Sequence, residues 1–167
     1  FKQPAFVCAD TEVLATLPAR EWACGCGEVA KTALIDGDEF FFWLSDQVSA
    51  VVDRQPDAVS EAIARCVVFK ADVVAQDKTE SRGVRECLNY GHTLAHAIEK
   101  LSGYGTYSHG HAVAEGMRFA ARMGMRLADM PAELAQAQGQ LLDDLGLPEL
   151  DWIASPAQVL DVMKRDK

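Results

Sequence analysis

One segment of the chain repeats polar side chains suited to metal and anion binding at helical spacing. These side chains are Arg85, Asn89, His92 and His96. They are four, three and four residues apart, so a continuous helix would carry them on a single face. A core stripe would be apolar, and a solvated face would be rich in lysine and glutamate. The segment therefore predicts a helix that lines a polar cleft.

The two imidazoles of this segment have an ordinary interpretation and a functional one. His92 and His96 are one helical turn apart, which suits two ligands of one metal ion. Without the glutamate of an HExxH motif the pair is a weak signal, because chance and buried, hydrogen-bonded histidines explain many such pairs. The presence of Arg85 and Asn89 on the same predicted face favours the functional interpretation.

A second pair of histidines follows a glycine-rich turn. His109 and His111 stand at the start of the next predicted helix, and Gly110 between them allows another segment to approach closely. Three of the four histidines could then meet where two adjacent helices pack. For His111 taken alone we favour a capping or surface role.

Glu28 and Lys31 form a further candidate pair, three residues apart on a predicted helix. The ordinary interpretation is a solvent-exposed ion pair, which contributes little to stability. Against it, Glu28 follows Gly27 and precedes two apolar residues, and few other charges occur on that helix.

Helices must position all of these side chains. Proline and capping signals start several of them, and glycine or proline ends others. We expect helices over residues 19–35, 39–46, 56–74, 85–102, 109–130 and 131–146, with a last one after Ser155. In helix 56–74 the expected buried stripe is Val59, Ile63, Cys66 and Val67, and it could extend to Lys70. Residues 76–83 read as a loop, and Ala5–Ala9 as a short strand.

Composition and charge narrow the function. The chain has 167 residues, 49% hydrophobic and 25% charged, which indicates one globular domain, alone or with a fragment of another. A net charge of −9 argues against nucleic acid and anionic membranes as partners, although a few converging cations can still bind a small anion. Five scattered cysteines fit reduced thiols. The chain starts at Phe1 and stops inside a charged run, so we expect an internal piece of a longer protein.

Several stretches occur in the order typical of one enzyme family. They are FKQPAFVCADTEVLATLPARE, GEVAKTALID, KADVVAQD, RECLNYGHTLAHAIE, HGHAVAEGM and the terminal DK. They span nearly the whole chain, and GHT-x-x-HA followed by HG-x-AV is the most specific part. By these motifs the chain resembles the C-terminal half of 3-dehydroquinate synthase, a sugar-phosphate cyclase of the shikimate pathway.

The resemblance implies a mainly α fold. We expect a helical bundle with a short N-terminal strand left from a preceding α/β domain. Residues 1–17 would be the tail of the nucleotide-binding domain, and residues 18–167 the helical metal- and substrate-binding domain. The family is a cytoplasmic homodimer that uses NAD. The glycine-rich NAD turn is absent here, so we expect this chain alone neither to bind NAD well nor to turn over.

The resemblance also implies a reaction and a set of residues. The family converts 3-deoxy-D-arabino-heptulosonate 7-phosphate to 3-dehydroquinate and phosphate, with NAD and a divalent metal, zinc or cobalt. A ring hydroxyl is transiently oxidised, phosphate is eliminated, hydride returns, and the ring opens and recloses. The metal positions correspond to Glu28, His92 and His109. The catalytic, substrate-contacting positions correspond to Lys31, Lys70, Arg85, Asn89, His96 and Lys167.

The sequence departs from the family pattern at several points. Ala95 replaces a frequent glycine, and residues 78–83 are about one residue longer than usual, which affects the alignment of Lys70. His111 replaces a glutamate and could compete with His109 for the metal. The alternatives are another sugar-phosphate cyclase of the valiolone or inosose type, a metal-dependent dehydrogenase of the glycerol type, or a non-catalytic helical dimerisation domain.

Overall fold

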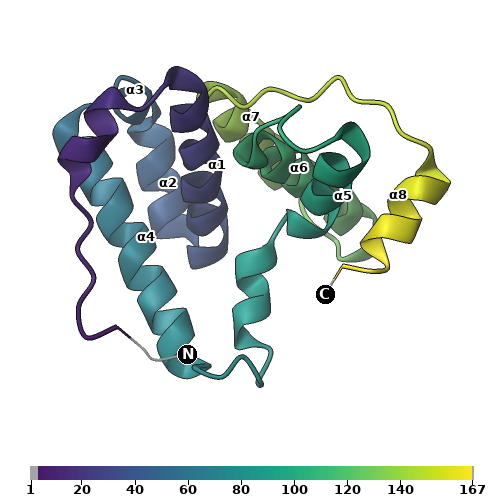
Figure 1. Ribbon diagram of the computed structural model, residues 1–167, viewed down its shortest axis with the longest axis horizontal. Coiled ribbons are helices and arrows are strands. Elements are labelled where there is room, and N and C mark those ends of the chain that lie inside the picture. The colour runs from purple at the N-terminus through teal and green to yellow at the C-terminus, as the bar shows by residue number, and fades with distance from the viewer. Residues whose placement is uncertain (1–3, 167) are drawn as a thin grey trace.

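All regular secondary structure is helical in the part of the chain that the computed structural model describes, residues 4–166 (Figure 1). This confirms the mainly α fold. The elements in chain order are the 3-10 helix η1 (Thr11–Thr16), α1 (Ala19–Asp36), α2 (Asp38–Asp46), α3 (Val48–Val52), α4 (Pro56–Gln76), the 3-10 helix η2 (Val84–Asn89), α5 (His92–Ser102), α6 (His109–Leu127), α7 (Ala132–Asp144) and α8 (Pro156–Met163).

Helix α1 joins two groups of helices. It packs against α2 and α4 on one side and against α6 on the other, while α5 packs against both α6 and α8. Figure 1 shows α8 beside α5 at the outer edge of the molecule. The core between these helices contains Phe40, Leu44, Ile98, Met117 and Leu142, each at most 1% exposed. None of the described helices is both long and apolar enough to cross a membrane.

The strand expected over Ala5–Ala9 is wrong. These residues are exposed and have no regular structure. A strand requires a neighbouring strand to pair its backbone groups, and residues 4–166 contain none. The chain instead enters η1 directly, where the Asp10 carboxylate accepts a hydrogen bond from the Glu12 backbone N–H at 2.9 Å.

The long helix expected over residues 85–102 is interrupted. Residues 84–89 form η2, and α5 begins only at His92. Gly91 between them has φ +79°, a left-handed conformation that a continuous right-handed helix excludes. The stripe expected on α4 is also partly wrong, because Val59 is buried but Val67 is 52% exposed. Val73, farther along α4, is buried while Lys70 is exposed, so Val67 and Lys70 lie on a face of α4 that the other helices leave uncovered.

Glycines allow the backbones of α1, α5 and α6 to touch. A Cβ on Gly110 at the start of α6 would lie 2.6 Å from the Cα of Cys24 on α1, and one on Gly27 would lie 2.8 Å from the Gly110 carbonyl oxygen. A Cβ on Gly116 of α6 would lie 2.7 Å from the carbonyl carbon of Gly91, just before α5. No side chain fits at these crossings, so the start of α6 is held against the middle of α1, and the start of α5 against the middle of α6.

Candidate metal centre and the surrounding site

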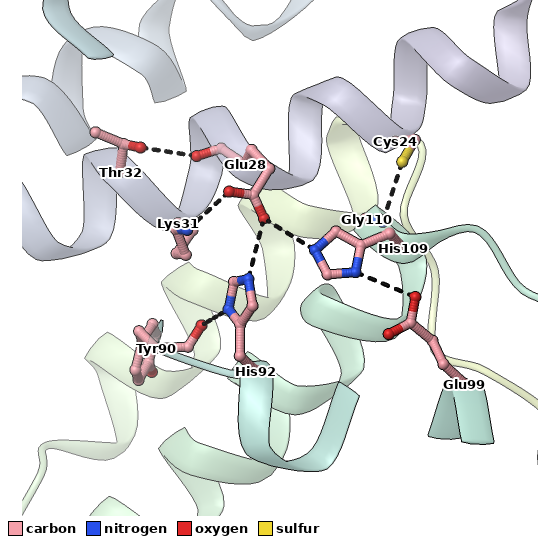
Figure 2. Close-up of polar contacts among 9 residues, drawn as sticks. All are labelled: Cys24, Glu28, Lys31, Thr32, Tyr90, His92, Glu99, His109 and Gly110. Atoms are coloured by element: carbon pink, nitrogen blue, oxygen red, sulfur yellow. Dashed lines mark hydrogen bonds and ion pairs between the residues drawn. The ribbon is translucent and has the colours of Figure 1, made fainter. Parts of the chain in front are cut away.

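Three side chains from three helices converge at these crossings. Glu28 lies in the middle of α1, whereas His92 and His109 are the first residues of α5 and α6. One ligand atom from each lies within 4.8 Å of the other two, and Figure 2 shows both imidazoles directed at the Glu28 carboxylate. The structure therefore brings together the three residues expected as metal ligands.

The distances in this cluster fit a shared ion better than direct hydrogen bonds. Oε1 of Glu28 is 3.6 Å from Nε2 of His92 and 3.7 Å from Nε2 of His109, beyond hydrogen-bonding range. This oxygen is buried and has no hydrogen-bond partner among the described residues. Zinc bonds of about 2.0–2.1 Å in a tetrahedron place neighbouring ligand atoms about 3.3 Å apart. One carboxylate and two imidazoles at these separations fit a divalent cation such as Zn²⁺.

The second nitrogen of each imidazole is held by another group (Figure 2). Nδ1 of His92 donates to the Tyr90 carbonyl oxygen at 3.2 Å, and Nδ1 of His109 donates to the Glu99 carboxylate at 3.2 Å. Each bond leaves the lone pair on Nε2, the nitrogen that faces Glu28. Sequence reasoning missed Glu99, although it lies three residues after His96 and seven after His92, on the same helical face.

The pKa of His92 is lowered from its ordinary value. Burial of the ring is the largest cause, and the hydrogen bond to the Tyr90 carbonyl oxygen opposes it. The positive charge of Lys31 lowers the pKa further. The shift favours the neutral imidazole, which is the form that binds metals.

Lys31 completes the inner part of the site. Its Nζ is 2.7 Å from the other Glu28 oxygen, Oε2, and its side chain is 9% exposed. This pair is therefore not the solvated surface pair of the ordinary interpretation. A cavity of about 230 Å³ beside it is lined by Glu28, Lys31, Lys70 and Cys66, among others. The expected substrate contacts Lys31 and Lys70 thus share one cavity with a metal-ligand candidate.

Arg85 and Asn89 are not on one face with the histidines, because the chain turns at Gly91. Arg85 lies on η2 and its Nη1 is 3.4 Å from a Glu80 carboxylate oxygen. Asn89 is exposed and lines a separate cavity of about 700 Å³. The helical spacing that predicted a single four-residue stripe was therefore misleading for these two residues.

The remaining expected residues fall into three places. His96 lies beside the cluster, with its ring centroid 5.6 Å from that of His92. His111 is outside the cluster, and its Nδ1 is 2.6 Å from Oγ of Ser108, a contact between two side chains that does not cap the backbone of α6. Burial, and to a smaller degree Arg20, lowers the pKa of His111. Lys167 lies outside the described residues.

The chain is similar to known proteins along its whole length. The family model described as 3-dehydroquinate synthase C-terminal matches residues 25–167. A 3-dehydroquinate synthase of Dehalococcoides mccartyi is 43% identical over 167 residues, and one of Acidithiobacillus ferrooxidans is 45% identical over 168 residues. Each of these matches covers 100% of this chain but only 46% of the relative. The chain thus spans about half the length of the curated relatives that it matches.

Solved structures with the same fold are sugar-phosphate cyclases. A 2-deoxy-scyllo-inosose synthase, complexed with carbaglucose-6-phosphate, NAD⁺ and Co²⁺, is 29% identical with a TM-score of 0.79, over 95% of this chain and 43% of that one. The 2-epi-5-epi-valiolone synthase of Streptomyces hygroscopicus, with NAD⁺ and Zn²⁺ bound, has a TM-score of 0.83 at 23% identity, over 93% of this chain and 43% of its own. Together with the family model and the curated relatives, these matches show that the chain belongs to the 3-dehydroquinate synthase C-terminal family.

Proposed function

We propose that this chain is the metal- and substrate-binding part of a 3-dehydroquinate synthase, a phosphate-releasing lyase of the shikimate pathway. Its substrate would be 3-deoxy-D-arabino-heptulosonate 7-phosphate and its products 3-dehydroquinate and phosphate. The convergence of Glu28, His92 and His109 is the observation that carries the proposal. Curated 3-dehydroquinate synthases are 40–47% identical to the chain, whereas the valiolone and inosose synthases are 23–30% identical, which favours the first substrate.

Glu28, His92 and His109 would hold the divalent cation, either Zn²⁺ or Co²⁺. When bound, the cation supplies Lewis acidity that polarises substrate hydroxyl oxygens, and NAD supplies the hydride acceptor. NAD would be bound mainly by the N-terminal domain, of which residues 1–17 would be the tail and residues 18–167 the helical partner. Three protein ligands would leave a coordination position open for a substrate oxygen, which suits a catalytic ion rather than a structural one.

The other side chains would bind and orient the substrate. It carries a carboxylate and a phosphate, and cations that form charge-assisted hydrogen bonds complement both. Lys31 and Lys70 are available in the cavity beside Glu28. We propose these two, with Arg85, Asn89, His96 and Lys167, as the catalytic, substrate-contacting set. The leaving phosphate can itself accept the substrate proton, so the site needs no strong protein base.

The metal site can be tested on the purified chain. We would titrate the metal-free protein with Co²⁺ and follow its visible absorption. Replacement of Glu28, His92 or His109 by alanine should weaken binding more than about 100-fold, since loss of an outer-shell partner alone typically costs 10–100-fold. His111→Ala is the matched control and should bind as the parent does. If the three ligand variants bind Co²⁺ as tightly as the parent protein does, these residues do not form the metal site.

Activity needs the full-length enzyme that contains this chain, which we expect to be a cytoplasmic homodimer. With NAD and Zn²⁺ it should release phosphate and form 3-dehydroquinate from the heptulosonate phosphate. Turnover of glucose 6-phosphate in its place, the sugar phosphate whose carba analogue is bound in the solved inosose synthase, would point to an inosose-type cyclase. Absence of turnover on both would favour a non-catalytic helical domain. Full activity of the isolated 167-residue chain would contradict the proposed division of labour.

A further inference from the structure

The last described residue contacts the third histidine of the site. Nδ1 of His96 on α5 is 2.9 Å from Oδ1 of Asp166, three residues after the end of α8. The side chain of Asp166 is only 20% exposed, although it lies close to the end of the chain, whereas that of His96 is 45% exposed. Asp166 is therefore held against α5 rather than left in solvent.

His96 is next to the metal cluster without belonging to it. Its ring meets that of His92 edge-on at 81° and lies nearly parallel to that of His109, at 23° with centroids 6.5 Å apart. The group of side chains able to share an ion contains His92 and His109 but not His96. His96 thus places an imidazole at the border of the cluster, within reach of a molecule that binds to the ion.

The partner on Nδ1 determines which nitrogen of the neutral ring carries the proton. An ionised carboxylate only accepts hydrogen bonds, so Nδ1 must donate to Asp166 and the lone pair must reside on Nε2. Within residues 4–166, Nε2 of His96 has no hydrogen-bond partner. The His96 side chain is also 45% exposed, so solvent or a bound molecule can reach the ring. The lone pair is therefore free to accept a hydrogen bond from a bound molecule.

We propose that Asp166 is a positioning residue that holds His96 in the Nδ1–H form, so that Nε2 accepts a hydrogen bond from a substrate hydroxyl. The role of His96 toward substrate rests on the proposed function, whereas the tautomer does not. Asp166 acts through His96 and does not touch the metal ligands in the structure.

The position of Asp166 depends on the docking of α8. This helix has no fully buried residue and attaches to the core through Val159, Val162 and Met163, which are partly buried. Asp161 of α8 pairs with Arg165, two residues after the helix ends, at 2.8 Å. The contact between Asp166 and His96 therefore ties the segment that follows α8 to the site.

The tautomer can be measured directly on the purified chain. Nitrogen-15 NMR of the histidine rings, recorded above their pKa, distinguishes a protonated ring nitrogen from one with a lone pair, and His96→Gln identifies the His96 signals. The parent should show Nδ1 protonated. In Asp166→Ala the population should shift toward the Nε2–H form. Asp161→Ala removes a carboxylate from α8, the helix that precedes Asp166, without touching His96, and should leave the signals unchanged.

Kinetics of the full-length enzyme supply a second, independent test. Asp166→Ala should lower kcat/KM about 10–100-fold, the usual cost of losing an orienting partner. In a His96→Gln background the same change should have less than about a twofold effect, because effects that act through one residue are not additive. An unchanged tautomer in Asp166→Ala, or additive effects in the double variant, would overturn the inference. An enzyme inactive on the proposed substrate would leave the NMR result standing and count only against the proposed function.

Discussion

The metal cluster of Glu28, His92 and His109 and the cationic rim of Lys70 and Arg85 are built in different ways. Around the cluster, α1, α5 and α6 touch through glycine backbones that leave no space for a Cβ. On the rim, Lys70 is exposed on α4, and Arg85 on η2 has only a 3.4 Å contact with Glu80. Metal–ligand bonds tolerate errors of about 0.2 Å, so the ligands need rigid supports. Long cationic side chains can adjust their position to a larger anion, so the residues of the rim do not need rigid supports.

Substitution of the crossing glycines should have the largest effect. Gly110→Ala or Gly116→Ala places a Cβ against the backbone of Cys24 or Gly91, and overpacking of this kind costs about 3 kcal/mol or more when backbone must move. The free energy of unfolding from urea denaturation should fall by that amount. Gly139→Ala on α7 is the matched control, because nothing lies within 4 Å of its added Cβ. It should raise stability by about 0.5–1 kcal/mol through helix propensity.

A comparable loss of stability in the Gly110→Ala and Gly139→Ala variants would mean that the helix crossings are not tight. The contrast between cluster and rim would then have no structural basis.

Removal of the carboxylate that orients His109 should have the next largest effect. Glu99→Ala frees Nδ1 of His109, and the affinity for Co²⁺ should fall about 10–100-fold. Glu133→Ala removes the same charge from the exposed first turn of α7 and serves as the control. If both variants bind Co²⁺ equally well, Glu99 does not support the cluster.

A substitution on the rim should leave the cluster intact. Lys70→Met removes an exposed cation from the cavity beside Glu28, so the free energy of unfolding should change by no more than about 0.5 kcal/mol. The Co²⁺ affinity of the isolated chain should likewise stay close to that of the parent, while KM of the full-length enzyme should rise. A large loss of metal affinity would show that rim and cluster are one coupled unit.

The smallest expected effect is on thiol reactivity. Burial raises the pKa of the Cys26 thiol to about 11, with Arg54 opposing the shift, whereas Cys87 on η2 is exposed. Because the thiolate is the reactive form, iodoacetamide at neutral pH should label Cys87 well before Cys26. Mass spectrometry of the labelled peptides measures this order. Equal labelling rates for Cys26 and Cys87 would indicate that α1 unfolds locally often enough to expose the Cys26 thiol.

The sequence predicted most helices, because their starts and ends have local causes. Pro56 at the first turn of α4 and the glycine between α1 and α2 are such signals. The interruption at Gly91 was missed because residues 85–102 keep helical spacing on both sides of it. Only packing against Gly116 of α6 shows why the chain must turn there. The strand at residues 5–9 was wrong for a similar reason, since strand formation depends on a partner and not on local propensity.

The metal cluster could not be derived from local spacing. The spacing of residues indicated His92 with His96, whereas the structure groups His92 with Glu28 and His109. These three lie far apart in the chain and meet only because Gly27 and Gly110 let α1 and α6 touch. Their assignment before the structure came from the family resemblance. The substrate role of Arg85, Asn89 and Lys167 stays a prediction.

The ion pair between Glu28 and Lys31 has a consequence for the kind of molecule that the site attracts. Its two charges cancel, so Glu28 would not by itself neutralise a divalent ion bound beside it. A protein with a net charge of −9 would otherwise repel a phosphorylated sugar acid. A divalent ion in the site, with the cation of Lys70 beside it, would thus offer such an anion local positive charge within an acidic protein.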